Sequence, residues 1–159
     1  MKRKKRKLSK CGFWAIVLIL CGAYIWPKPL IRNVKDSNII SIMYRADTWE
    51  NFGYFYPSQA VPTIDEGGLI QILNQSKAAV EVIPYTTIDG IPTGLVTLQL
   101  SVSDGGRVKT ITLGEWNRVT IQGGSTAYQI LNADSVLNRV LDFLQIDENT
   151  GVSQLQPGG

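Results

Sequence analysis

The chain carries few side chains of the types that most often perform catalysis. Its only cysteines are Cys11 and Cys21, both near the N-terminus, and it contains no histidine. Histidine-based triads, histidine general bases and zinc sites built on imidazole or thiolate ligands are therefore excluded from the rest of the chain. The few lysines beyond residue 26 lie in no Ser-x-x-Lys motif. We therefore predict no enzyme activity, no cofactor and no metal site.

Two adjacent carboxylates, Asp65 and Glu66, are the strongest remaining candidates for acid–base chemistry. They lie in the sequence Thr63-Ile-Asp-Glu66, which has the pattern of a helix capping box, and acidic residues at a helix start also match the helix dipole. We therefore interpret them as capping residues. Two short glycine runs, after Asp104 and at Gly123–Gly124, indicate hairpin turns rather than phosphate-binding loops.

A dense aromatic segment is the main candidate for a binding surface. Five aromatic residues lie between positions 49 and 56, half of all the aromatics beyond residue 26. Exposed aromatic side chains can stack on sugars or anchor a protein partner, although the simpler interpretation is that these residues fill the core. The candidate partner-binding residues are Trp49, Phe52, Tyr54 and Tyr56.

The N-terminal segment has the pattern of an export signal. Six consecutive basic residues, positions 2–7, precede an uncharged apolar run at 11–26. Positive charge followed by an apolar run directs translocation, with the charged end kept in the cytoplasm. We predict a basic cytoplasmic leader at 1–10 and a transmembrane anchor or signal segment at 11–26. The membrane segment includes Cys11, Trp14, Cys21 and Trp26.

Three fates of this segment are open. It could stay as an uncleaved single-pass helix, although 16 residues reach only about 24 Å against a hydrocarbon core of roughly 30 Å. It could be cleaved after Ala23, which follows other small residues. It could be lipidated at Cys21, although Leu20 stands where a small residue is expected. Each fate places the remaining domain outside the cytoplasm, as an anchored protein, a lipoprotein or a secreted protein.

The remaining domain is acidic. From Asp36 onward, six basic residues stand against all 13 acidic ones. A nucleic-acid-binding domain needs a cationic face, so nucleic acid is not a predicted partner. The predicted partners are membrane lipid, through the N-terminal segment, and a protein or cell-wall component.

Hydrophobic periodicity indicates the elements of this domain. Alternation is clearest at 95–103, where Val96, Leu98, Leu100 and Val102 share one face, and a hairpin partner follows at 107–113. A helix capped by Asn132 carries an apolar stripe from Val136 to Leu144. The other predicted elements are strands at 38–46, 117–122 and 126–131, a helix at 63–79 and an extended piece at 80–85.

Together these elements predict an α+β fold. It has an antiparallel sheet of four to six strands with two helices packed on one face, and an N-terminal transmembrane helix precedes it. In the predicted domain organisation, residues 27–37 form a spacer, 38–147 the extracytoplasmic domain and 148–159 a flexible tail.

This layout resembles the small uncharacterised extracytoplasmic domains of Gram-positive bacteria that follow a signal peptide or single anchor. The resemblance lies in the Ile-rich first strand at 38–42, the long hairpin, the strand bearing Ala127-Tyr128 and the Leu-rich last helix, and it covers about residues 36–146. It implies no activity and no functional residue. The predicted function is a non-catalytic binding, sensory or interaction module. The alternatives are an accessory subunit of a membrane assembly and a carboxylate-based cell-wall hydrolase.

Overall fold

The computed structural model describes residues 10–45, 52–57, 60–61, 64–80, 96–114, 116–124, 126–146 and 156–157. These residues form an α+β fold around one curved antiparallel sheet. Its strands are β1 (Lys28–Pro29), β2 (Ser37–Arg45), β3 (Phe52–Phe55), β5 (Lys77–Val80), β6 (Thr97–Asp104), β7 (Arg107–Leu113), β8 (Arg118–Ile121) and β9 (Ala127–Ile130). The helices are α1 (Lys10–Ile25), the 3-10 turn η1 (Val34–Asp36), α2 (Glu66–Gln75) and α3 (Ala133–Leu144).

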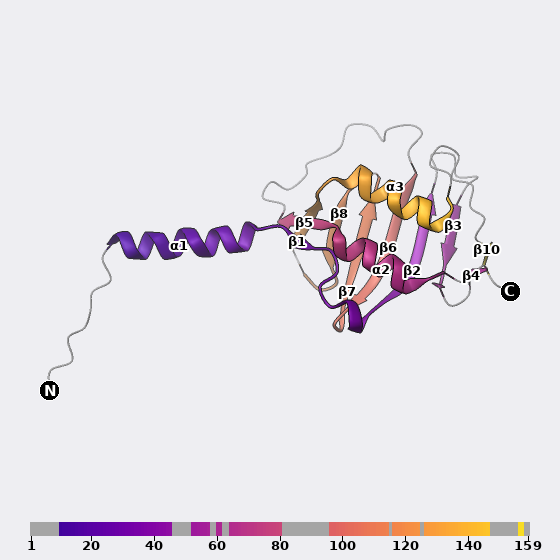
Figure 1. The fold of residues 1–159 in the computed structure, drawn as a ribbon, viewed down its shortest axis with the longest axis horizontal. Helices are drawn as coiled ribbons and strands as arrows, with labels where there is room; N and C mark the ends of the chain where they lie inside the picture. The colour runs from indigo at the N-terminus through magenta and orange to yellow at the C-terminus, as the bar shows by residue number, and fades with distance from the viewer. Residues whose placement is uncertain are drawn as a thin grey trace.

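The strands follow the order β1-β5-β9-β8-β7-β6-β2-β3 across the sheet. Helices α2 and α3 lie side by side on one face, while α1 extends away from the domain (Figure 1). A separate two-stranded antiparallel pair joins β4 (Ala60–Val61) to β10 (Gln156–Pro157). The sequence pattern gave no indication of this pairing near the C-terminus.

The predicted central hairpin is confirmed. Residues 96, 98, 100 and 102 are all buried beneath the helices. Gly105 and Gly106 have φ angles of 58° and 81°, the left-handed values that a two-residue hairpin turn needs. The turn places Asp104 opposite Arg107 and fixes the register of the whole β6–β7 pair.

The first long strand differs from its predicted pattern at one residue. Strict alternation along the predicted strand 38–46 places Ile40 on the same face as Ile42 and Tyr44, but a bulge between Ile39 and Ser41 shifts the pairing with β6. Because a bulge inserts one extra residue, Ile39 takes the core position and Ile40 is only half-buried.

Both predicted helices are present, one of them shorter than expected. The stripe on α3 is buried as predicted, and Asn132 stands at its N-terminus, although without a side-chain capping bond. Helix α2 begins at Glu66, and its cap is Asp65, whose carboxylate accepts a hydrogen bond from the Gly68 backbone at 3.2 Å. The helix ends at Gln75, so the predicted continuation to 79 is wrong; residues 77–80 form β5 instead.

The fold-class prediction is wrong in two respects. The sheet has eight strands rather than four to six, because the short strands β1 and β5 have too few residues to show a period. In addition, none of the described helices has the length and apolar character required to cross a bilayer, which overturns the predicted transmembrane helix. Helix α1 has 16 residues, a length of about 24 Å.

The predicted spacer at 27–37 is also part of the domain. It contains β1 and η1, and its residues Leu30 and Ile31 are buried in the core. The backbone of Leu30 donates to the carbonyl of Ser76 at 2.9 Å, which ties this segment to the end of α2. Leu30 and Ile31 are only two apolar residues between Lys28 and Arg32. So short an apolar run does not distinguish a core segment from a linker in the sequence.

Candidate functional site

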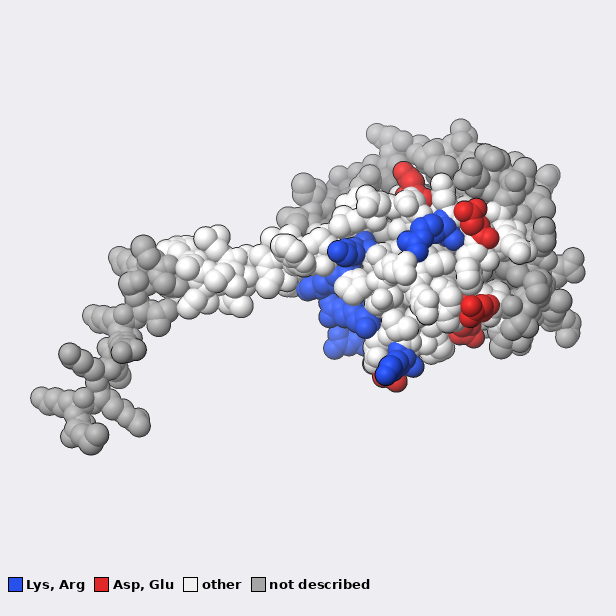
Figure 2. Space-filling model, in the orientation of Figure 1, with Lys and Arg blue, Asp and Glu red and all other residues white. Residues whose placement is uncertain are grey.

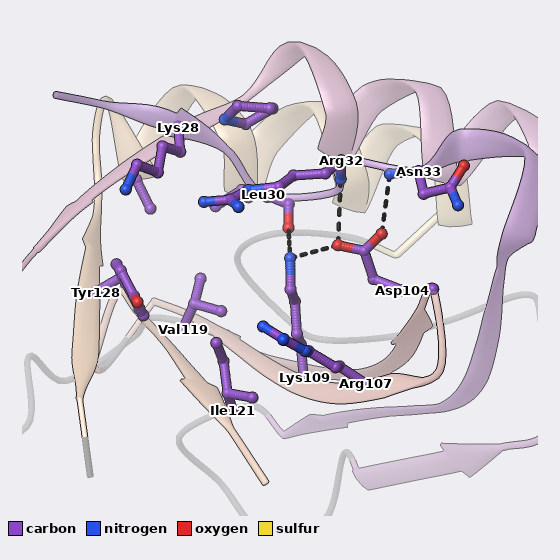
Figure 3. Close-up of a pocket in the computed structure, with 13 residues that line it drawn as sticks. Lys28, Leu30, Arg32, Asn33, Asp104, Arg107, Lys109, Val119, Ile121 and Tyr128 are labelled. Atoms are coloured by element: carbon purple, nitrogen blue, oxygen red, sulfur yellow. Dashed lines mark hydrogen bonds and ion pairs between the residues drawn. The ribbon is translucent and has the colours of Figure 1, made fainter. Parts of the chain in front are cut away.

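A pocket of about 460 Å³ lies between residues 28–33 and strands β7, β8 and β9 (Figure 3). It opens on the helix-covered side of the sheet. On β7, alternate residues Ile111 and Leu113 face the core, and the same alternation carries Lys109 and Arg107 toward the pocket. The sheet therefore changes from apolar core to charged pocket along one face of one strand.

The centre of this site is an ion pair between two buried side chains. The Lys109 ammonium lies 2.5 Å from Asp104 Oδ2 and donates a second hydrogen bond to the Leu30 carbonyl at 2.8 Å (Figure 3). Lys109 is 8% exposed and Asp104 is 7% exposed. Burial of charge is costly unless it is paired and hydrogen-bonded, and here both conditions are met.

The Asp104 carboxylate accepts several further hydrogen bonds. The backbone amides of Arg32 and Asn33 donate to it at 3.2 Å and 2.9 Å, and the Ser37 hydroxyl donates at 3.2 Å. Burial acts to raise the pKa of Asp104, but the hydrogen bonds from Lys109, Asn33 and Arg32 and the Lys109 charge outweigh it and lower the pKa to about 2. Asp104 is therefore an ionised structural acceptor at neutral pH.

Residues 28–33, which form the roof of the pocket, are held from two sides. Asp104 and Lys109 bind this segment on the sheet side, and the Asn74 side chain of α2 donates to the Ile31 carbonyl at 2.7 Å on the helix side. Leu30 and Ile31 are buried between these contacts, so this segment is anchored both to the sheet and to α2.

Three cationic side chains around the pocket have no charge partner in the part of the chain that the structure describes. Within the described residues, Lys28, Arg32 and Arg107 make no ion pair. The Lys28 ammonium lies 5.7 Å from the centroid of the Tyr24 ring. Basic side chains gather on this part of the surface, at the end of the domain nearest α1 (Figure 2). The pocket therefore has a local excess of positive charge although the domain is acidic.

Apolar and aromatic residues form another part of the lining. Val119 and Ile121 come from β8 and Tyr128 from β9. A second hollow of about 500 Å³ adjoins the first and shares Arg107, Ile121 and Tyr128 with it. A ligand with an anionic group and an organic portion could therefore be accommodated here.

The aromatic residues singled out in the sequence lie elsewhere, at the β3 edge of the sheet. Tyr54 and Tyr56 are each 45% exposed, and their rings meet edge to face with centroids 5.3 Å apart. A hydrogen bond between their hydroxyls lowers the pKa of Tyr54 and raises that of Tyr56. Trp49 lies outside the described residues, and of Phe52 only the backbone, in β3, is described.

The residues predicted for the membrane segment lie on or next to α1. Trp14, Cys21 and Trp26 are exposed, and Cys21 is a free thiol. Cys11 lies within the helix, although its side chain is not described. None of these residues contributes to the pocket.

The carboxylates considered for acid–base chemistry have structural partners. Asp65 caps α2, and Glu66 accepts a hydrogen bond from the Ile39 backbone at 3.1 Å. Among the residues that the structure describes, no three His, Cys, Asp or Glu side chains group together as metal ligands would.

Sequence reasoning missed the pocket, although one signal pointed to it. Asp104 and Lys109 continue the core-facing alternation of β6 and β7, so charged residues occupy positions where the pattern calls for apolar ones. A buried charge at such a position needs a partner, and the hairpin register places the two side chains near each other. The contact of both with residues 30–33 required the tertiary structure.

Comparison with known proteins returned no match among protein-family models, curated proteins or solved structures. The resemblance to extracytoplasmic domains of Gram-positive bacteria therefore stays a prediction.

Proposed function

We propose that this chain is an exported, non-catalytic binding module that works outside the cytoplasm. In this proposal the N-terminal segment associates with membrane lipid during export, and the α+β domain binds a ligand through its basic pocket. The observation that carries the export half is helix α1. Eight large apolar side chains between Phe13 and Ile25 are 47% to 70% exposed, on a helix that projects from the domain (Figure 1).

An apolar surface of this extent is unfavourable in water, and soluble domains rarely expose one without a partner for it. The six basic residues directly before α1 favour an anionic membrane surface as that partner. Cleavage after Ala23 and lipidation at Cys21 are both compatible with the fold, because the first strand of the sheet begins only at Lys28. Either event would leave the domain complete.

The binding half of the proposal is supported by the pocket. Its walls are fixed by the bonds of Asp104 and Lys109, and its free cationic groups point to recognition of a ligand. Catalysis is a weaker interpretation, because Asp104, the one carboxylate among the described lining residues, is engaged by Lys109 and by backbone amides. Lys109 is likewise held by two acceptors and is not free to act as a base.

Protease accessibility tests the export half. The full chain with a C-terminal epitope tag is expressed in a bacterial host, and intact protoplasts are treated with external protease. We expect the tag to be digested without lysis, and to be protected when the residues at 2–7 are all replaced by Gln. A tag that is protected in the unaltered chain would contradict export.

Two further variants separate the fates of the segment. Cys21→Ser should abolish incorporation of a labelled fatty acid if the thiol is lipidated, and Ala23→Arg should block release if cleavage follows Ala23. Mass spectrometry of the mature N-terminus provides the readout for both.

A second candidate function, an accessory subunit of a membrane assembly, is favoured by the exposed pair Tyr54 and Tyr56. Aromatic side chains with exposed polar ends are common anchors at protein interfaces. A photo-crosslinking residue at position 54 should give a specific adduct in intact cells, while the same residue at the exposed position Gln129 should give none. Equal labelling at both positions would count against this candidate.

A further inference from the structure

We propose that the basic pocket binds a phosphate group, carried either by a small organic phosphate or by the headgroup of an anionic lipid. The inference rests on the proposed function as a binding module and names its ligand class. Phosphate binding by the pocket does not depend on export of the chain, so an experiment can refute either proposal without refuting the other.

The charge balance of the pocket selects an anion. Among the described residues of the lining, Asp104 carries the only negative charge, and the Lys109 ammonium neutralises it at 2.5 Å. Lys28, Arg32 and Arg107 then remain as three cations around one hollow with no ion pair to any described residue. A metal cation would be repelled from such a site, while an anion with more than one negative charge would be attracted.

The types of these side chains favour phosphate in particular. Two of the three cations are arginines, whose planar guanidinium groups form paired hydrogen bonds with phosphate or carboxylate oxygens. Figure 3 shows the Arg32 and Arg107 side chains extending into the hollow from opposite walls, one from the roof and one from β7. Together with Lys28, the two arginines provide more hydrogen-bond donors and more positive charge than a ligand with a single carboxylate group would use.

The backbone around the site is fixed before any ligand arrives. The Arg32 backbone amide is fixed by Asp104, and Arg107 directly follows the tight turn at Gly105–Gly106. A preformed site loses less conformational entropy on binding than a flexible one. The apolar floor of Val119 and Ile121 gives the organic portion of the ligand a surface to pack against.

The position of the pocket allows both sources of phosphate. Lys28 lies three residues after the end of α1 and contacts Tyr24 within that helix. If α1 associates with lipid, the pocket lies near the headgroups of the same membrane. A soluble phosphate ester would reach the pocket equally well from solvent.

Isothermal titration calorimetry tests the proposal on the full chain in neutral detergent micelles. One arm titrates glycerol 3-phosphate. The second arm, after removal of the detergent, measures co-sedimentation with vesicles of phosphatidylglycerol against vesicles of phosphatidylcholine, on chains whose residues 2–7 are all replaced by Gln so that the basic leader does not bind the vesicles. The test variants are Arg32→Gln and Arg107→Gln. The matched control is Arg139→Gln, which removes an exposed arginine of α3 that bonds Gln75 and does not line the pocket.

We expect each pocket variant to weaken binding about tenfold or more, since a hydrogen bond to a charged group is involved, and the control to change it little. Because Arg32 and Arg107 are exposed and lack ion pairs within the described residues, their variants should melt close to the unaltered chain. Binding of glycerol 3-phosphate with these losses supports a soluble ligand, and arginine-dependent binding to phosphatidylglycerol vesicles alone supports a lipid headgroup. Absence of binding in both arms, or equal binding by the pocket variants and the control, would overturn the proposal.

Discussion

The ammonium group of Lys109 bridges the carboxylate of Asp104 and the backbone carbonyl of Leu30, a residue 79 positions earlier in the chain. This bridge joins the β6–β7 hairpin to the segment that leads out of α1, and it is almost entirely shielded from solvent. It therefore serves two purposes: it closes the end of the core and it positions the roof of the basic pocket.

Removal of the Lys109 charge should strongly destabilise the fold. Lys109→Met leaves the Asp104 carboxylate buried without its cation, and we expect the free energy of unfolding to fall by about 3–5 kcal/mol. Urea denaturation at neutral pH measures the change. The matched control, Lys77→Met, alters an exposed lysine on β5 and should stay within about 0.5 kcal/mol. A Lys109 variant as stable as this control would show that the pair is not structural.

The stability of the domain should fall in acid because of Asp104. Its folded pKa of about 2 lies below the ordinary 3.8, so the ionised form stabilises the fold above about pH 4, and this contribution is lost as the pH falls from about 4 to 2. The lost contribution is about 2 kcal/mol. Urea midpoints measured over that interval should fall more steeply for the unaltered chain than for Asp104→Asn. Parallel slopes for the two proteins would contradict the assigned pKa.

Truncation of either of two core leucines should cost about 2–5 kcal/mol. Leu98 is fully buried on β6 and Leu141 almost fully buried on α3, so each change to Ala leaves a cavity between sheet and helix. Leu131→Ala, at a partly exposed position before α3, should cost much less. Thermal melts of the three variants provide the comparison, and a neutral Leu98→Ala or Leu141→Ala would refute this description of the core.

Among the glycines whose surroundings the structure describes, Gly114 is the one whose replacement should destabilise the fold most. Its φ of 94° disfavours any side chain, and an added Cβ would lie 2.4 Å from the Val96 carbonyl oxygen. Gly114→Ala should therefore cost more than the roughly 1–2 kcal/mol expected from φ alone. Gly106→Ala is a suitable control, because its φ is also positive but nothing lies within 4 Å of the added atom. Equal melting temperatures for the two variants would contradict the close approach.

Local patterns predicted the parts of the fold that repeat a period over several residues. The alternation from Val96 to Val102 and the stripe from Val136 to Leu144 each extend over enough positions to specify both the element and its buried face. The bulge near Ile40 was not predictable, because it depends on how β2 pairs with β6 rather than on the sequence of β2.

The pocket depended on contacts that no local pattern records. Neighbours in sequence place Asp104 next to a hairpin turn and Leu30 in a spacer. Their shared contact with Lys109 appears only when the hairpin and the segment at 28–33 are brought together in the fold. A charged residue in a core-facing register is the one sequence signal that could have drawn attention to the site.

Nuclear magnetic resonance on the isotope-labelled full chain provides the most direct test of the account, which holds that Asp104 and Lys109 organise a phosphate-binding pocket. Addition of glycerol 3-phosphate should shift resonances at positions 28–33, 105–109 and 119–128, including the side-chain signals of Arg32 and Arg107. Signals from the Tyr54–Tyr56 edge and from Arg139 should not move. No shifts at saturating glycerol 3-phosphate, or shifts spread evenly over all exposed arginines and lysines, would contradict a phosphate-binding pocket organised by Asp104 and Lys109.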